Sequence, residues 1–150
     1  MKNVWIAFAL FSIAACAQKQ IKPFEVLPEG QLSLVVNVDG ISCCEGVMRL
    51  AVYNDSDYWL SKTDIVRGRL GFILGESQTF EIHGLPAGKY AVAVFQDKDS
   101  DNVLDRWLGL LPKEPYGFSN NVGKYGPASF HKASFELSED KTISIQLNSR

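Results

Sequence analysis

Apolar side chains recur at every second position over much of this chain beyond residue 30, and this period constrains the fold more than any other feature of the sequence. The stretch 32–38 shows it most simply, because apolar residues occupy all of its even positions. Alternation with period two places one set of side chains on each face of a β-strand, so that one face packs and the other meets solvent. No amphipathic helix of useful length competes with this pattern. The sequence therefore predicts an all-β protein.

Several further stretches fit short strands separated by turn-forming residues. Residues 47–53, 72–74 and 79–82 fit strands, and residues 134–137 and 142–147 are expected to close the domain as a hairpin. Residues 89–96 are apolar on both faces, which indicates a central strand. Residues 58–71 fit either a helical turn or a long loop. About seven short strands predict one antiparallel, immunoglobulin-like β-sandwich of two sheets over residues 31–150.

Residues 1–16 have the pattern of an export signal. Lys2 precedes an apolar run over residues 4–15 that is interrupted only by Ser12, and small residues then lead to Cys16. The run is too short to span a bilayer comfortably, since a spanning helix needs about 20 apolar residues. Residues 13–16 also resemble the bacterial lipobox, in which the cysteine is acylated and becomes the mature N-terminus. Several acyl chains on Cys16 would give a stable membrane anchor.

The alternative for this segment is ordinary signal cleavage before Gln18, which would give a secreted soluble protein. Residues 17–30 contain Pro23 and Pro28 with little periodicity and are expected to form a tether. No aspartate follows Cys16, and the resemblance to lipoproteins of Gram-negative bacteria implies the outer membrane. The predicted location is the periplasm or the cell surface.

Two adjacent cysteines, Cys43 and Cys44, lie in the first turn of the predicted domain. Outside the cytoplasm a disulfide is permitted, and neighbouring cysteines can form one only as a strained ring that is easily reduced. Two free thiols in a loop are the alternative. The pair lacks the spacing of a redox motif or of a zinc site.

An acidic loop follows the predicted central strand and has the spacing of a calcium-binding loop. Carboxylates at positions 1, 3, 5 and 9 and a backbone carbonyl at position 7 are the candidate ligands: Asp97, Asp99, Asp101, Val103 and Asp105. Asn102 must make the sharp turn that usually needs glycine, and Leu108 stands where an EF-hand has a bidentate glutamate. We expect weak Ca²⁺ binding, on the order of 0.1–1 mM. A solvated acidic turn is the alternative.

Aromatic and amide side chains follow the acidic loop and form a candidate ligand-binding set. Its members are Trp107, Tyr116, Asn120, Asn121 and Tyr125. They could offer a platform for a carbohydrate or a peptide. The alternative is that the aromatic rings cover one open end of the sandwich and the amides bond to loop backbone.

Charge and motifs narrow the function. The formal net charge is −2 and basic residues are scattered, so nucleic-acid binding is not expected. His83 and His131 are far apart, and nucleophile elbows, phosphate loops and dinucleotide fingerprints are missing. The sequence predicts a protein that is not an enzyme, with a hydrolase that uses the acidic loop as its metal site as a further alternative.

Two segments resemble known families. Residues 84–92, Gly-Leu-Pro-Ala-Gly-Lys-Tyr-Ala-Val, resemble the turn and strand of transthyretin-like and carboxypeptidase-regulatory-like sandwiches. The wider pattern, above all Tyr-Gly-Phe-Ser-Asn-Asn at residues 116–121, resembles the bacterial family called domain of unknown function 2141 over residues 32–147. Asn102 and the cysteine pair depart from that family's usual pattern. The resemblance implies a sandwich fold and brings no established activity.

These observations predict an exported, lipid-anchored and non-catalytic binding or structural module of the cell envelope, with calcium as its only candidate cofactor. Its expected partners are the membrane, through the lipid on Cys16, and an unidentified envelope protein or glycan.

Overall fold

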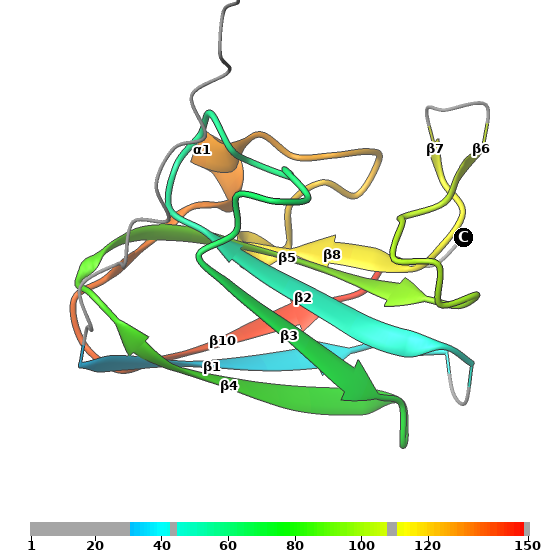
Figure 1. Ribbon diagram of the computed structural model, residues 1–150, viewed down its shortest axis with the longest axis horizontal. Coiled ribbons are helices and arrows are strands. Elements are labelled where there is room, and N and C mark those ends of the chain that lie inside the picture. The colour runs from blue at the N-terminus through cyan, green and yellow to red at the C-terminus, as the bar shows by residue number, and fades with distance from the viewer. Residues whose placement is uncertain (1–30, 43–44, 108–110, 149–150) are drawn as a thin grey trace, which may run out of the picture.

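The computed structural model describes residues 31–42, 45–107 and 111–148, of which Arg106, Trp107 and Leu111 are described in their backbone only. Two β-sheets lie face to face and make up most of the molecule (Figure 1). The predicted signal (residues 1–16), the tether (17–30) with Cys16, and the pair Cys43 and Cys44 lie outside the described residues. No helix in the described ranges is long and apolar enough to cross a membrane.

The first sheet has three strands in the order β10-β1-β4. They are β10 (Lys141–Gln146), β1 (Leu32–Asp39) and β4 (Ser77–Leu85). β1 runs antiparallel to β4 and parallel to β10, with Val36 opposite Ile143. The expectation of a purely antiparallel sandwich is therefore wrong at this one pairing.

The second sheet has the order β3-β2-β5-β8, and β9 also pairs with β5. Its strands are β2 (Val47–Tyr53), β3 (Arg67–Phe72), β5 (Gly88–Asp97), β8 (Tyr116–Phe118) and β9 (Phe135–Leu137). β5 has β2 on one side and both β8 and β9 on the other, which confirms its predicted central place. A small hairpin of β6 (Arg106–Trp107) and β7 (Leu111–Pro112) stands apart from both sheets.

The main core lies between the two sheets and follows from the period-two pattern. Leu34, Val36 and Val38 of β1 have no exposed surface, and the inward residues of the other sheet face them. That partner set includes Met48, Leu50, Val52, Val92 and Val94. Full burial of an aliphatic side chain contributes about 1.5–3 kcal/mol each, so this layer stabilises the two-sheet architecture. The all-β sandwich predicted from the sequence is confirmed.

The predicted closing hairpin is wrong. The strands exist as β9 and β10, but β9 joins β5 in one sheet and β10 joins β1 in the other. Leu137 and Ile145 are both buried in the main core. Because they reach it from opposite sheets, the chain must cross from one sheet to the other between them instead of turning back on itself.

Residues 58–71 contain a strand that the sequence did not reveal. β3 begins at Arg67 and ends at Phe72, so the strand expected over residues 72–74 lies earlier than predicted. Arg67 donates from Nη2 to the Gly84 carbonyl at 3.4 Å, and Arg69 donates from Nε to the Glu81 carbonyl at 3.3 Å. Both acceptors are in β4. Guanidinium groups therefore occupy positions of β3 where apolar side chains would have marked a strand.

A second apolar cluster covers one end of the outer face of the five-stranded sheet. Its buried members are Ala91, Tyr116, Phe118, Ala128 and Ala133. The loop after β2 and the short helix α1 (Phe130–Ala133) lie over this end (Figure 1). Trp59 joins the loop to the cluster by donating from Nε1 to the Ala128 carbonyl at 2.7 Å. Among the described residues, no second buried cluster lies over the other end of this face.

Candidate functional site

The acidic loop begins at Asp97, the last residue of β5, which has no exposed surface. Arg49 of β2 donates from Nε to Asp97 Oδ2 at 2.5 Å. Asp97 also accepts hydrogen bonds from the backbone N–H of Asn102 at 3.0 Å and of Asp101 at 3.2 Å. One buried carboxylate thus fixes the loop to the edge of the sheet.

A second buried carboxylate, Glu114, completes this scaffold. It is 6% exposed and accepts from the backbone N–H of Lys98 at 2.7 Å and of Asp105 at 3.0 Å. Glu114 therefore holds both ends of the acidic loop. Neither periodicity nor ligand spacing marks it in the sequence, because the β6–β7 hairpin separates it from the loop it supports.

The two carboxylates have opposite pKa shifts. Burial alone raises the pKa of Asp97, but the Arg49 hydrogen bond, the Asn102 and Asp101 N–H donors and the Arg49 charge outweigh it, so the pKa lies below its ordinary value of 3.8. Burial, with a smaller contribution from the charges of Asp97 and Asp99, raises the pKa of Glu114 despite its two backbone donors. Asp97 is thus an ionised structural group at neutral pH.

The remaining carboxylates of the loop converge at its surface. Asp99, Asp101 and Asp105 can bring one oxygen each within 4.8 Å of one another, and so can Asp97, Asp99 and Glu114. The structure thus brings together three of the predicted calcium ligands, Asp99, Asp101 and Asp105, which are exposed or half-buried. A fourth, Asp97, belongs to the second set, which also contains Asp99. The backbone N–H of Val103 donates to Asp101 at 2.7 Å. The Nζ of Lys113 lies 3.8 Å from Asp105 Oδ2 and compensates part of the negative charge of these carboxylates.

Asn102 makes the sharp turn expected of it, with φ at 69°. Ser100 also has a positive φ of 62°. Asparagine is among the residues that tolerate this left-handed region. The half-buried Leu104 packs against the second apolar cluster and joins the loop to it. The loop is therefore a compact, backbone-bonded turn with an oxygen-rich surface.

The described aromatic and amide candidates do not meet in one exposed platform. Tyr116 is 4% exposed, whereas Tyr125 is 81% exposed. The Nδ2 of Asn120 donates to the carbonyls of Lys132 and Ser134, and that of Asn121 donates to Ser144. Trp107 belongs to β6, and its side chain lies outside the described residues. Tyr116 is thus buried and both amides bond to backbone, as the alternative interpretation has it, but Asn121 bonds to strand β10 and not to a loop.

Close packing against β10 requires the glycine of the Tyr-Gly-Phe string, Gly117. A Cβ at this position would lie 2.6 Å from Ile145 Cγ2 and 3.1 Å from the Gln146 carbonyl oxygen. Only glycine allows β8 to approach β10 this closely. This part of the motif therefore serves the packing of the two sheets.

Gln96 holds Ser42 and Glu45, the residues on either side of Cys43 and Cys44. This side chain has no exposed surface and donates from Nε2 to the carbonyls of Ser42 and Glu45, each at 2.8 Å. Its Oε1 accepts from the backbone N–H of Ser42 at 3.0 Å. Gln96 thus fixes the flanks of the cysteine pair.

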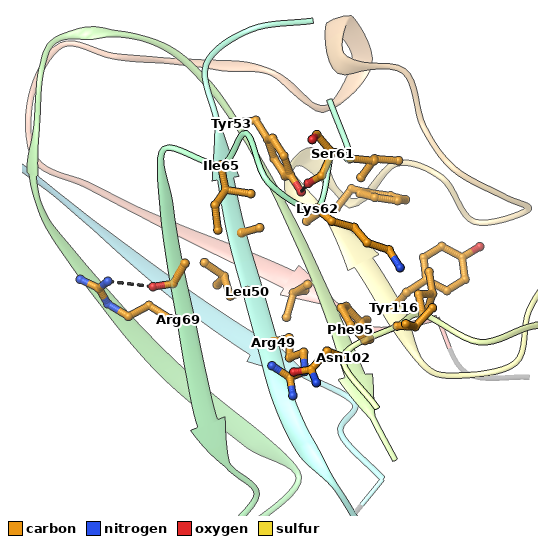
Figure 2. A pocket seen from close by; sticks show the side chains of 18 of the residues that line it. Arg49, Leu50, Tyr53, Ser61, Lys62, Ile65, Arg69, Phe95, Asn102 and Tyr116 are labelled. Carbon is orange, nitrogen blue, oxygen red and sulfur yellow. Dashed lines mark hydrogen bonds between the residues drawn. The ribbon is translucent and has the colours of Figure 1, made fainter. Parts of the chain in front are cut away.

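A groove of about 950 Å³ lies on the outer face of the five-stranded sheet, next to the cluster that covers one end of that face (Figure 2). Its base is formed by β2 and β5, and its sides by the segments 60–70 and 102–105 with Pro112, Tyr116, Phe118 and Pro127. Aliphatic and aromatic side chains make up most of its lining. Sequence reasoning missed this groove, because it depends on which residues of two strands lie side by side.

Comparison with known proteins places the chain in a family. A family model described as "Uncharacterized protein conserved in bacteria (DUF2141)" matches residues 36–146. The chain belongs to the DUF2141 family. The match runs from the middle of β1 to the end of β10, and confirms the family indicated by the Tyr-Gly-Phe-Ser-Asn-Asn string.

A search of curated proteins gave no significant match. Among solved structures, this DUF2141 chain is similar to a fimbrial assembly protein from Parabacteroides distasonis, at 11% sequence identity and a TM-score of 0.31. The similarity covers 76% of this chain and 51% of the other. The chain thus spans about half the length of that protein.

Proposed function

We propose that this protein is an exported, non-catalytic binding or structural module of the cell envelope, anchored to the outer membrane through a lipid on Cys16. In this proposal the acidic loop binds Ca²⁺ weakly and the ion makes the loop more rigid. The loop is a fixed feature of the sandwich, so the ion would act on a surface that is already folded.

The convergence of carboxylates on Asp99 carries the calcium proposal. Asp99 belongs to both sets of three carboxylates, and each set spans at most 4.8 Å. Calcium takes six to eight oxygen ligands at about 2.3–2.6 Å, and carboxylates this close repel one another unless a cation compensates them. Asp97 and Glu114 already hold the loop in shape, so cation binding would need little reorganisation.

The same geometry favours a non-catalytic role. A general acid needs a pKa near the working pH, whereas Asp97 has a lowered pKa and stays ionised. Glu114 has the raised pKa expected of an acid, yet each of its two oxygens accepts a backbone N–H of the loop. Both groups are better suited to holding the loop than to transferring protons.

Thermal unfolding of the full chain with and without calcium tests the proposal. At ten times the dissociation constant, one bound ion stabilises the folded state by about 1.4 kcal/mol, which corresponds to a rise of several degrees in Tm. Asp99→Asn should abolish the rise, because Asp99 is common to both carboxylate sets. Asp57→Asn is the matched control on an exposed loop and should keep the rise. A parent protein whose Tm is unchanged at 10 mM calcium would contradict the calcium proposal.

A further inference from the structure

The base of the groove on the outer sheet face is formed by two paired strands, β2 and β5. Ala51 of β2 and Ala93 of β5 lie directly opposite each other and form part of its base. Tyr53 and Phe95 are the next residues on this face of the same two strands, and their rings are large. The small alanine side chains therefore leave a hollow between them. The volume of about 950 Å³ falls at the upper end of the range of small-molecule sites, about 300–1,000 Å³.

Apolar side chains at the sides of the groove are unusually exposed. Leu70 is 52% exposed, Ile65 is 39% exposed and Val103 is 37% exposed. Leu70 and Ile65 lie on the β3 side, and Val103 lies on the side of the acidic loop. Exposed apolar residues that face one another across a hollow mark a surface that gains free energy when a ligand covers it.

Among the described residues, four charged side chains line the groove, and three of them have partners: Arg49, Arg69 and Asp105. Arg49 pairs with Asp97, Arg69 donates to the carbonyls of Gly68 and Glu81, and Asp105 lies near Lys113.

Lys62 is the fourth charged side chain of the groove. It points from its loop into the groove on the side of Tyr116 (Figure 2). Among the described residues its ammonium group has no ion pair or hydrogen bond. The groove therefore combines an apolar base with one ammonium group that has no bonding partner among the described residues.

We propose that the groove binds a fatty acid, with the acyl chain over Ala51 and Ala93 and the carboxylate at Lys62. A single acyl chain suits the mostly apolar lining, and one carboxylate matches the ammonium group of Lys62, which has no partner among the described residues. This site goes beyond the proposed function, because it depends on neither the lipid on Cys16 nor a calcium ion.

Calorimetric titration of the full chain with dodecanoate below its micellar concentration tests the assignment. We expect saturable binding of one equivalent. Each methylene contributes up to about fourfold in affinity, so octanoate should bind more than tenfold more weakly than dodecanoate. Dodecyltrimethylammonium has the same chain and the opposite charge, and it too should bind more than tenfold more weakly.

Two matched pairs of variants separate the groove from other apolar surface. Leu70→Ser should weaken dodecanoate binding at least tenfold, whereas Leu74→Ser should not, although Leu74 is 94% exposed and outside the groove lining. Lys62→Gln should weaken dodecanoate binding without affecting octanol binding, and Lys132→Gln on α1 should leave both unchanged. Thermal unfolding of each variant confirms that it is folded.

Several results would overturn the assignment. They are a lack of saturable binding by the parent protein, equal losses from Leu70→Ser and Leu74→Ser, or binding of dodecyltrimethylammonium as tight as that of dodecanoate. Binding of dodecyl phosphate tenfold tighter than that of dodecanoate would assign the site to a phosphate head group instead of a carboxylate. Because none of these readouts involves calcium or Cys16, their failure is distinct from a failure of the proposed function.

Discussion

Asp97 is the residue on which the acidic loop depends. A buried carboxylate is costly unless it is paired and hydrogen-bonded, and Asp97 meets both conditions through Arg49 and the backbone of Asp101 and Asn102. Arg49 also lines the groove. The Arg49–Asp97 ion pair therefore fixes the acidic loop and also orients Arg49 in the lining of the groove.

Asp97→Asn should destabilise the protein and change its acid sensitivity. Removing one partner of a buried pair costs about 3–5 kcal/mol, and we expect the lower end because the Arg49 side chain is 23% exposed. Since the pKa of Asp97 is lowered by folding, its contribution is present above pH 3.8 and is lost as the pH falls through the lower folded pKa. Urea unfolding between pH 2 and 7 measures both effects.

The gap in unfolding free energy between the parent and Asp97→Asn should therefore narrow in acid. Asp57→Asn is the control, since an exposed aspartate away from special contacts should change stability by at most about 0.5 kcal/mol. A gap that stays constant down to pH 2 would show that Asp97 is not an ionised, stabilising group.

At the scale of elements, Ser119 joins three segments at one buried point. Ser119 opens η1 (Ser119–Asn121), has no exposed surface, and donates from Oγ to the Ala133 carbonyl at 2.6 Å. Its Oγ accepts from the Val92 N–H of β5 at 2.9 Å. The serine of the Tyr-Gly-Phe-Ser-Asn-Asn string thus connects β5, η1 and α1.

Ser119→Ala should cost about 1–3 kcal/mol of unfolding free energy, because it leaves a buried N–H and a buried carbonyl without their partner. Ser129→Ala is the matched control: Ser129 is the exposed N-cap of α1 and makes no side-chain hydrogen bond there. Equilibrium denaturation of both variants checks the difference. Equal stability of the two variants would mean that the Ser119 contacts contribute nothing.

The elements also show what the sequence could and could not predict. β1 and β5 were predicted because their inward positions are apolar. β3 was not, because Arg67 and Arg69 occupy inward positions and reach the carbonyls of β4. Alternation likewise located β9 and β10 but gave no information on their partners, since either sheet can bury Leu137 or Ile145 equally well.

The acidic loop and the groove also differ in how far the sequence predicts them. Local spacing was enough to group Asp99, Asp101 and Asp105, because they lie on one turn. Glu114 comes from beyond a hairpin, and the groove depends on the register that sets Ala51 opposite Ala93. Contacts made through long-range pairing are not visible in a single sequence.

At the scale of the whole molecule, the proposed membrane attachment is through a lipid on Cys16. In cells, Cys16→Ser should move the protein from the membrane fraction to the soluble fraction and abolish incorporation of a labelled fatty acid that survives a denaturing gel. Cys44→Ser is the control and should change neither. A parent protein that takes up no covalent label would contradict the lipid anchor. The denaturing gel also removes any fatty acid held non-covalently in the groove.

The parallel pairing of β1 with β10 has a consequence for the order of folding. Val36 sits beside Ile143, so the three-stranded sheet cannot be completed until more than a hundred further residues have been made. Pairings this distant in sequence slow folding, because the loop entropy is lost before the contact is gained. A nascent chain can thus pair β1 with β4 early, while the opposite edge of β1 keeps its backbone groups unpaired until β10 has been made.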